Sequence, residues 1–441
     1  MNIIKSVGSP MKEMKPKFVQ LVFVDINGVP KGMEIPAGRY DEAVKTGIAF
    51  DGSSIPGFQG IEDSDLVFKA DPSTYAEVPW EGIARVYGYI YKDEKPYSAD
   101  PRGVLRSALE KLEHEGFRAH IGPEPEFYLF RKNGSWELQI PDSGGYFDLV
   151  TLDKSREVRR EIAAYMTSFG LIPEVLHHEV GNAQHEIDFR YDEALRTADN
   201  VVSFKYIVRA VAEMHGLYAT FMPKPLYGFP GNGMHLHISL WSGDENVFTG
   251  EDGLSEKALY FMGGILKHAR ALVAITNPTV NSYKRLVPGY EAPVYTSWGY
   301  RNRSAMIRVP AFWGRGARIE YRCPDPSANP YLAFAAVIAA GLDGVKRKID
   351  PAGYVEENVY EMSDEKQRTL GITTLPSSLG EAIEELKKDS VIKDALAGAY
   401  DRFVEHKERE WAGYLEYLRS ENVPEDTKKV TEWELGRYFY I

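Results

Sequence analysis

The stretch Ile121–Phe130, IGPEPEFYLF, places two carboxylates, Glu124 and Glu126, inside an otherwise apolar run. Successive side chains of a strand point to opposite faces, so these two carboxylates and Tyr128 share one face. Ionised carboxylates side by side in a buried strand repel each other unless a cation lies between them. The alternative is an exposed edge strand, which Pro125 would suit because proline cannot donate to a ladder. This stretch by itself leaves both interpretations open.

Three downstream motifs carry chemistry that complements this pair. They are HHEVGNAQHEI with Glu179 and Glu186, GNGMHLHISLW with His235 and His237, and ARIEYRCPDP with Arg318, Glu320 and Arg322. In the last two motifs the polar side chains lie two residues apart, so each set shares one face of a strand. Apolar neighbours such as Ile319 and Tyr321 favour a covered strand, and buried charges need partners. The sequence therefore predicts a divalent-metal site made by glutamates and arginines that face an anionic substrate.

Other histidines in these motifs receive no such role. We expect His177, His178 and His185 to be packed core residues rather than metal ligands. In PDPSANP, Asp325 and Asn329 are typical turn and helix-cap residues.

Length and composition restrict the class of protein. A chain of 441 residues exceeds the usual size of a single core, so two domains are expected. No apolar run approaches ~18 residues, and the start lacks the apolar segment of a signal peptide. The single cysteine, Cys323, excludes an internal disulfide, and the net charge of -12 argues against a nucleic-acid surface. We expect a soluble cytoplasmic protein without a nucleic-acid or membrane partner.

The first hundred residues predict a small sheet. Strands are expected at 18–26 and 32–35, joined by the Asn27-Gly28 turn, and at 84–91. The segment 50–66, FDGSSIPGFQGIEDSDL, is predicted to be an irregular loop, either a mobile connection or one packed through Ile55, Phe58 and Ile61. Asp100-Pro101 predicts a helix start, so we divide the chain there into domains of residues 1–103 and 104–441.

The second domain predicts irregularly alternating helices and strands. Strands are expected at 120–130, 218–221 and 235–241, and helices at 101–115, 154–168, 192–214, 255–274, from 329, at 379–388 and at 393–420. Hairpin-like pairs without a regular βαβ repeat favour an α+β fold over a doubly wound one. The tail TEWELGRYFYI is too apolar for a free end, and we expect it to dock, with another subunit as one candidate surface.

Six motifs together resemble type I glutamine synthetases of the short-form (alpha-like) branch, from about Phe18 to the C-terminus. They are GPEPEFYLF, HHEV…QHEID, FMPKP…GNGMHLHISL, NSYKRLVPGYEAP, RNRSAMIR and RIEYRCPDPSANPYLAFAA, in the family's order. The resemblance implies a small β-grasp-like N-terminal domain and a larger catalytic domain with a curved antiparallel sheet and flanking helices. It implies ATP-dependent ligation of ammonia to the γ-carboxylate of L-glutamate through γ-glutamyl phosphate, a step of nitrogen assimilation. It also implies a homododecamer of two hexameric rings.

The resemblance further implies a site with two divalent ions. Glu126, Glu179 and Glu186 would hold one ion, and Glu124, His235 and Glu320 the other. This oxygen-dominated set suits Mg²⁺ or Mn²⁺ better than zinc. The implied glutamate-binding residues are Gly231, Arg285, Glu291 and Arg322, and the implied nucleotide or phosphate contacts are Glu174, Tyr191, His237, Ser239, Arg303, Arg308, Arg315 and Arg318. For Glu174, Tyr191 and Ser239, ordinary surface positions remain the alternative.

Three residues carry the implied catalysis. Asp51 would help bind and deprotonate ammonium, which must lose a proton before it attacks. Asp51 and Ser54 would come from the neighbouring subunit, so active sites would lie between subunits. Glu291 would close over the intermediate and exclude water, and Arg303 would stabilise charge on the transferred phosphoryl group.

Three positions depart from the family or vary within it. Pro230 replaces an asparagine that helps hold the amino acid, which puts the detailed glutamate contact in doubt. Tyr360 stands where one branch is adenylylated, but the segment after Phe130 lacks that branch's insertion, which argues against this modification. Gly60 replaces a feedback-sensing arginine of another branch, which argues against that mode of inhibition by glutamine.

Other functions remain alternatives from the sequence. One is a ligase for a larger amine such as a polyamine, which the presence of Asp51 and Glu291 disfavours. Another is a catalytically inactive structural or regulatory relative, which Glu291 and Arg303 disfavour. A hydrolytic enzyme with two metal ions would leave the arginines unexplained.

Overall fold

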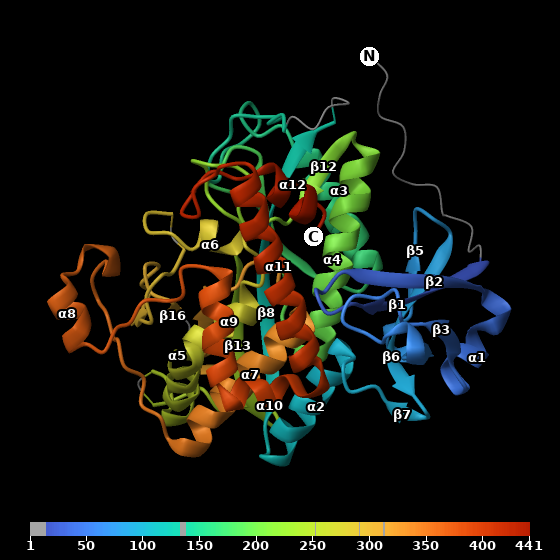
Figure 1. The fold of residues 1–441 in the computed structure, drawn as a ribbon, viewed down its shortest axis with the longest axis horizontal. Helices are drawn as coiled ribbons and strands as arrows, with labels where there is room; N and C mark the ends of the chain where they lie inside the picture. Colours follow the sequence, from blue (N-terminus) through green and yellow to red (C-terminus); the bar gives the residue numbers. More distant parts are fainter. Residues whose placement is uncertain (1–14, 133–137, 252, 291, 312–313) are drawn as a thin grey trace.

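A computed structural model describes residues 15–132, 138–251, 253–290, 292–311 and 314–441. Figure 1 shows a small sheet of N-terminal strands on one side, a larger sheet running through the centre, and helix α8 (Asp364–Thr369) projecting on the opposite side. The separation of strands and helices gives an α+β fold, as the sequence predicts.

Within the described residues, seven strands form the N-terminal sheet in the order β2-β1-β6-β4-β3, with β5 and β7 also paired to β6. They are β1 (Phe18–Val24), β2 (Pro30–Pro36), β3 (Ile48–Asp51), β4 (Asp65–Ala70), β5 (Ala76–Val78), β6 (Ile83–Lys92) and β7 (Lys95–Pro96). The β1–β2 hairpin turns at Gly28, whose φ of 78° favours glycine, as the Asn-Gly pair predicts.

The prediction of an irregular loop over 50–66 is partly wrong. Both ends of that segment enter the sheet, because Phe50 pairs with Leu66 and Asp51 with Asp65 in the β3–β4 ladder. Phe58 packs as expected, with its ring centroid 5.8 Å from that of Phe23, whereas Ile61 is 88% exposed.

Ten described strands form the catalytic sheet, in the order β15-β16-β17-β13-β8-β10-β9, with β11 and β12 paired to β8 and β14 to β13. They are β8 (Arg118–Arg131), β9 (Pro173–His178), β10 (Gln184–Phe189), β11 (Asp192–Glu193), β12 (Leu217–Thr220), β13 (Met234–Ser242), β14 (Glu245–Asn246), β15 (Trp298–Tyr300), β16 (Ile307–Val309) and β17 (Ile319–Tyr321). The pairs are antiparallel except β15–β16. The long strand β8 lies in the middle, so the opening motif is covered rather than at an edge.

Most of the described helices cover the catalytic sheet and its flanks, whereas α1 (Tyr40–Lys45) packs on β4 of the N-terminal sheet and α8 projects from the fold. The other described helices are α2 (Pro101–His114), α3 (Arg156–Ser168), α4 (Ala194–Met214), α5 (Glu256–Thr276), α6 (Ser282–Arg285), α7 (Pro330–Arg347), α9 (Leu379–Lys388), α10 (Ser390–Leu396), α11 (Tyr400–Ser420) and α12 (Glu432–Tyr438). Among the described helices, α5 is long and apolar enough to cross a membrane, yet 78% of its apolar window is buried inside the fold. A core helix of a soluble protein has this property.

Helices α5 and α7 approach closely through two glycines. A Cβ on Gly264 would lie 2.1 Å from the carbonyl oxygen of Ala340, and one on Gly344 would lie 2.1 Å from that of Tyr260. Helix α7 starts at Pro330 after the N-cap Asn329, whose side chain accepts a hydrogen bond from the Tyr331 amide, as the sequence predicts. The same side chain donates to the carbonyl oxygens of Asp25 and Ile26, which ties the helix start to the N-terminal sheet.

The predicted single helix over 393–420 is wrong. The chain breaks into α10 and α11 at Ala397, whose φ of 48° ends the α-helical path. The tail docks on its own chain, because Thr220 donates its hydroxyl to the carbonyl oxygen of Phe439 at 2.6 Å. Glu434 of α12 also accepts a hydrogen bond from Asn281 and forms an ion pair with Lys284 of helix α6. The tail therefore supports the helix that carries Arg285.

Candidate active site

Strand register brings the predicted site residues together from distant parts of the sequence. Glu126 of β8 lies directly opposite Glu186 of β10, and Glu124 lies opposite His235 of β13. On the next pair, His237 lies opposite Glu320 of β17. Paired residues of antiparallel strands project to the same face. One face of the sheet therefore collects the acidic and imidazole groups.

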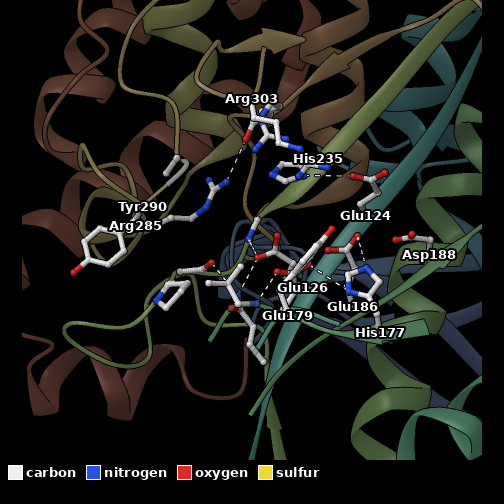
Figure 2. A pocket seen from close by; sticks show the side chains of 18 of the residues that line it. Glu124, Glu126, His177, Glu179, Glu186, Asp188, His235, Arg285, Tyr290 and Arg303 are labelled. Atoms are coloured by element: carbon white, nitrogen blue, oxygen red, sulfur yellow. Dashed lines mark hydrogen bonds and ion pairs between the residues drawn. The ribbon is translucent and has the colours of Figure 1, made fainter. Parts of the chain in front are cut away.

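This face lines a cavity of about 740 Å³ (Figure 2). Its lining includes the predicted residues Glu124, Glu126, Glu179, Glu186, Gly231, His235, Arg285, Arg303, Arg308, Glu320 and Arg322. The structure thus brings together all six predicted metal ligands and the described part of the predicted glutamate set.

Glu124, His235 and Glu320 offer donor atoms that lie within 4.8 Å of one another. Nδ1 of His235 is 3.4 Å from Oε2 of Glu124 and 3.9 Å from Oε1 of Glu320. The second separation is too long for a hydrogen bond, and both suit ligands that share one ion at about 2.0–2.1 Å from each. The residues present therefore fit a small divalent cation.

A second group contains two residues that the sequence analysis missed, His177 and Asp188. Their donor atoms and that of Glu186 lie within 4.8 Å of one another, and Figure 2 shows both residues beside Glu186. Nδ1 of His177 lies 3.5 Å from Glu179, and Nε2 lies 3.8 Å from Glu186. Asp188 could have been found, because it lies two residues after Glu186 and so shares its strand face. His177 required the β9–β10 register, in which it pairs with Glu186.

The electrostatics of the cavity differ between its two sides. On the acidic side, burial and neighbouring carboxylates raise the pKa of Glu186 well above its usual value, and burial raises that of Asp188 to about 6. Burial also raises the pKa of Glu126. Raised pKa values mean that too little positive charge lies near these carboxylates to stabilise their ionised form. A bound divalent cation would provide that charge.

On the basic side the carboxylates are already compensated. Burial would raise the pKa of Glu320, but nearby positive charge, including that of Arg322 in direct contact, outweighs it and lowers the pKa to about 2. Burial would likewise raise the pKa of Glu124, yet its contacts with His237 and His235 lower it. Burial, with the charge of Arg322, lowers the pKa of His235 to about 4, so this ring is neutral and able to bind a metal.

The arginines of this cavity are held in place by the protein. Arg308 and Arg322 both donate to Glu320, the latter at 2.6 Å. Arg285 donates to the carbonyl oxygen of Cys323 at 2.6 Å. A Cβ on Gly231 would lie 2.7 Å from Cγ of Arg285, so the missing side chain leaves room for this arginine. The guanidinium groups are therefore positioned before any ligand binds.

A second cavity of about 300 Å³ adjoins the first and shares Glu124, Val175 and Asp188 with it. Its lining contains six of the eight predicted nucleotide contacts: Glu174, Tyr191, His237, Ser239, Arg315 and Arg318. Arg303 and Arg308 line the first cavity instead. The aromatic rings of His120 and Trp241, which the sequence analysis did not single out, complete this wall at a centroid separation of 5.3 Å.

Other predicted residues lie outside these cavities or outside the described residues. Asp51 is exposed at the end of β3, where it accepts a hydrogen bond from the Ser53 amide, and it lines neither cavity. Glu291 lies outside the described residues. Tyr360 also lies outside both cavities, and its hydroxyl donates to the carbonyl oxygen of Ala292. Pro230, by contrast, lines the larger cavity, and its carbonyl oxygen accepts from Tyr128.

Comparisons with known proteins agree with this architecture. The family description "Glutamine synthetase, beta-Grasp domain" matches residues 15–93, and "Glutamine synthetase, catalytic domain" matches residues 98–438. A glutamine synthetase of Pyrococcus furiosus is 76% identical over 441 residues and the full length of both chains. A glutamine synthetase of Thermotoga maritima is 50% identical, covering 99% of this chain and 100% of the relative. A solved structure described as "GmaS/ADP complex-Conformation 1" superposes with a TM-score of 0.85 at 33% identity, covering 96% of this chain and 97% of that one.

Fold, site and comparisons define the chain as an ATP-dependent carbon–nitrogen ligase. It belongs to the glutamine synthetase family, whose reaction is the ATP-dependent synthesis of glutamine from glutamate and ammonia. The small N-terminal sheet is the β-grasp domain of that family.

Proposed function

We propose that the larger cavity holds L-glutamate and two divalent cations, Mg²⁺ or Mn²⁺, and that the adjoining smaller cavity holds ATP. The observation that carries this proposal is the shared wall of Glu124 and Asp188 between the two cavities. A γ-phosphate entering from one side would meet a γ-carboxylate held on the other. Transfer of the phosphoryl group to glutamate forms γ-glutamyl phosphate, whose phosphate is then a good leaving group.

The first cation site is one of the two donor groups, and the second is the set of glutamates that the resemblance implies, which shares Glu186 with the other donor group. Glu124, His235 and Glu320 would hold one ion, and Glu126, Glu179 and Glu186 the other, with Asp188 and His177 beside the second ion. When bound, the cations neutralise charge between the phosphates and the carboxylate.

The protein's own residues bind and orient the substrates. Arg285 and Arg322 would bind glutamate carboxylates in charge-assisted pairs, with Gly231 leaving space beside them. Arg318 and His237 would face the phosphates from the smaller cavity, and Arg303 would approach the transferred phosphoryl group from the larger one. The nucleoside would lie near Trp241 in the smaller cavity. The residues around it there are Tyr191, Ser239, Arg315 and Glu174.

Attack by ammonia requires a base and exclusion of water. Asp51 of a neighbouring subunit would accept the proton that ammonium loses, and Glu291 would help to exclude water from the acyl phosphate. The exposed position of Asp51 outside its own chain's cavities supports donation to another subunit. We propose the double-ring dodecamer as the assembly and the cytoplasm as its location. The division after residue 103 likewise stays a proposal.

The test is product formation by the purified protein. Glutamine and ADP should form in equal amounts from glutamate, ammonium and ATP with Mg²⁺ or Mn²⁺. A panel of amines, from ammonium and methylamine to a polyamine, measures the preference, and ammonium should give the highest kcat/KM. Phosphate release without amide product would instead indicate a hydrolase, and preference for a larger amine would overturn ammonia as the substrate.

A further inference from the structure

Arg85 is a buried cation without a counter-charge. It lies on β6, it is 3% exposed, and its Nε and Nη1 have no hydrogen-bond partner. Among the residues that the structure describes, it forms no ion pair with a carboxylate. Buried charges are normally paired, because removing an ion from water is unfavourable.

A neighbouring arginine shows how the same interface compensates a charge. Arg102 is also 3% exposed, and it donates to both oxygens of Asp199 at 3.0 and 2.9 Å and to Asp71 at 2.8 Å. Within the described ranges, Arg85 instead contacts the rings of Tyr87 and Tyr206, at 5.0 and 4.6 Å from its guanidinium carbon. These cation–π contacts offset part of the desolvation and leave the two N–H groups without acceptors.

Arg85 lines a cavity of about 30 Å³ between the N-terminal sheet and helix α4. The polar side chains around it include Thr74, Arg196, Asn200 and Ser203. Asp199 also lines the cavity, but its oxygens already accept hydrogen bonds from Arg102 and Tyr331. The cavity is therefore positive in character and contains no uncommitted carboxylate among the described residues.

We propose that this cavity is a binding site for a halide-sized monovalent anion, with chloride as the probe. A water molecule needs about 10–15 Å³ of such space, so the cavity has room for about two waters or one small ion. A four-oxygen anion such as phosphate or sulfate is too large. Water in the cavity can solvate the guanidinium, but only an anion also neutralises the buried charge, which decides between these occupants.

The bound anion connects the two domains. Arg85 belongs to the N-terminal sheet, whereas Asn200 and Ser203 belong to α4. The surrounding contacts already cross this boundary: the hydroxyls of Tyr87 and Ser203 are 2.8 Å apart, and Arg196 donates to the carbonyl oxygen of Ser73 at 3.1 Å. Because the pocket exists only in the folded protein, an anion bound there stabilises the folded state by mass action.

The deciding experiment is a crystal of the intact protein soaked in sodium bromide. We expect an anomalous bromide peak in this cavity, within hydrogen-bond distance of the Arg85 guanidinium. A map with no peak there, showing a buried water only, overturns the proposal whatever the other measurements show.

A second measurement tests the energetic role. Sodium chloride replaces sodium gluconate at constant ionic strength, and Tm is followed by calorimetry. The wild-type Tm should rise and saturate, whereas Arg85→Gln should show no saturable rise. Arg39→Gln, which removes an exposed arginine paired with Glu42 in the same domain, is the matched control and should keep the wild-type response. A flat wild-type curve contradicts the proposal, and if Arg85→Gln does not fold, the bromide map on the wild-type protein still decides.

Discussion

Nε of Arg318 lies 3.0 Å from Nδ1 of His237, and this contact determines the tautomer of the imidazole. A guanidinium group only donates, so Nδ1 accepts and Nε2 carries the proton. Nε2 then donates to Oε1 of Glu124 at 2.7 Å. A chain of hydrogen bonds therefore runs from the smaller cavity to a predicted metal ligand in the larger one.

Replacing Arg318 with lysine should weaken this chain while keeping the positive charge. A hydrogen bond to a charged group contributes about 1.5–3 kcal/mol, so we expect kcat/KM for ATP to fall about 10–100-fold. Steady-state kinetics at saturating glutamate measure the change. Arg409→Lys on the exposed face of α11 is the control and should match the wild type. An unchanged kcat/KM in Arg318→Lys would exclude a role for Arg318 at the nucleotide.

Replacing Asp188 with asparagine removes a charge beside the second donor group without changing its size. Residues that support metal ligands typically change metal affinity 10–100-fold, so the Mg²⁺ concentration for half-maximal activity should rise by about that factor. The measurement is a Mg²⁺ titration at fixed ATP, with Asp244→Asn in the exposed β13–β14 turn as the control. Coincident titration curves for Asp188→Asn and the wild type would place Asp188 outside the metal site.

If active sites lie between subunits, two inactive variants should restore activity to each other when they assemble together. Asp51→Ala and Glu126→Gln should each be inactive, because one lacks the proposed base and the other a metal ligand. If the two variants are dissociated, mixed and reassembled, sites that combine the intact Asp51 of one subunit with the intact cavity of another should recover activity. Separately reassembled variants are the controls. Mixed particles without activity would indicate that Asp51 serves its own chain.

The glycine contact between α5 and α7 predicts a large difference between two helical substitutions. Gly264→Ala places a Cβ 2.1 Å from the carbonyl oxygen of Ala340, and such overpacking typically costs about 1–3 kcal/mol. Gly436→Ala in α12 meets no atom within 4 Å, and its better helix propensity should stabilise by about 0.5–1 kcal/mol. Thermal unfolding should show opposite shifts in Tm. Equal shifts would mean that the helices can separate at no cost.

His268 of α5 predicts a pH-dependent contribution to stability. Burial lowers its pKa, but hydrogen bonds to Asp389 at 2.6 Å and Asp343 at 3.1 Å outweigh burial and raise it above 6.5. A raised pKa in the folded state favours the protonated form. The stabilisation is therefore complete below pH 6.5 and disappears as pH rises through the raised value.

The measurement is the free energy of unfolding against pH for the wild type and His268→Gln. Their difference should be largest below pH 6.5 and should shrink towards alkaline pH. Lys267→Gln on the same helix is the control and should follow the wild-type pH profile. A difference that stays constant with pH would show that folding does not shift the pKa of His268.

Local sequence is enough to predict which side chains share a face. Strand alternation placed Glu124 with Glu126, and His235 with His237, because the direction of a side chain depends only on its position along an extended backbone. Helix starts at Pro101 and Pro330 were likewise predictable, since capping residues act on the backbone next to them. The long motifs added the family, which the comparisons confirm.

How these faces meet depends on the complete three-dimensional fold. His177 enters the acidic group through the β9–β10 register, and Arg308 and Arg322 converge on Glu320 from separate segments. The split between two cavities, the break at Ala397 and the unpaired charge of Arg85 also depend on packing between distant segments. Register and burial are set by the whole sheet and its covering helices, so residues far apart in the chain acquire their partners only when the complete fold forms.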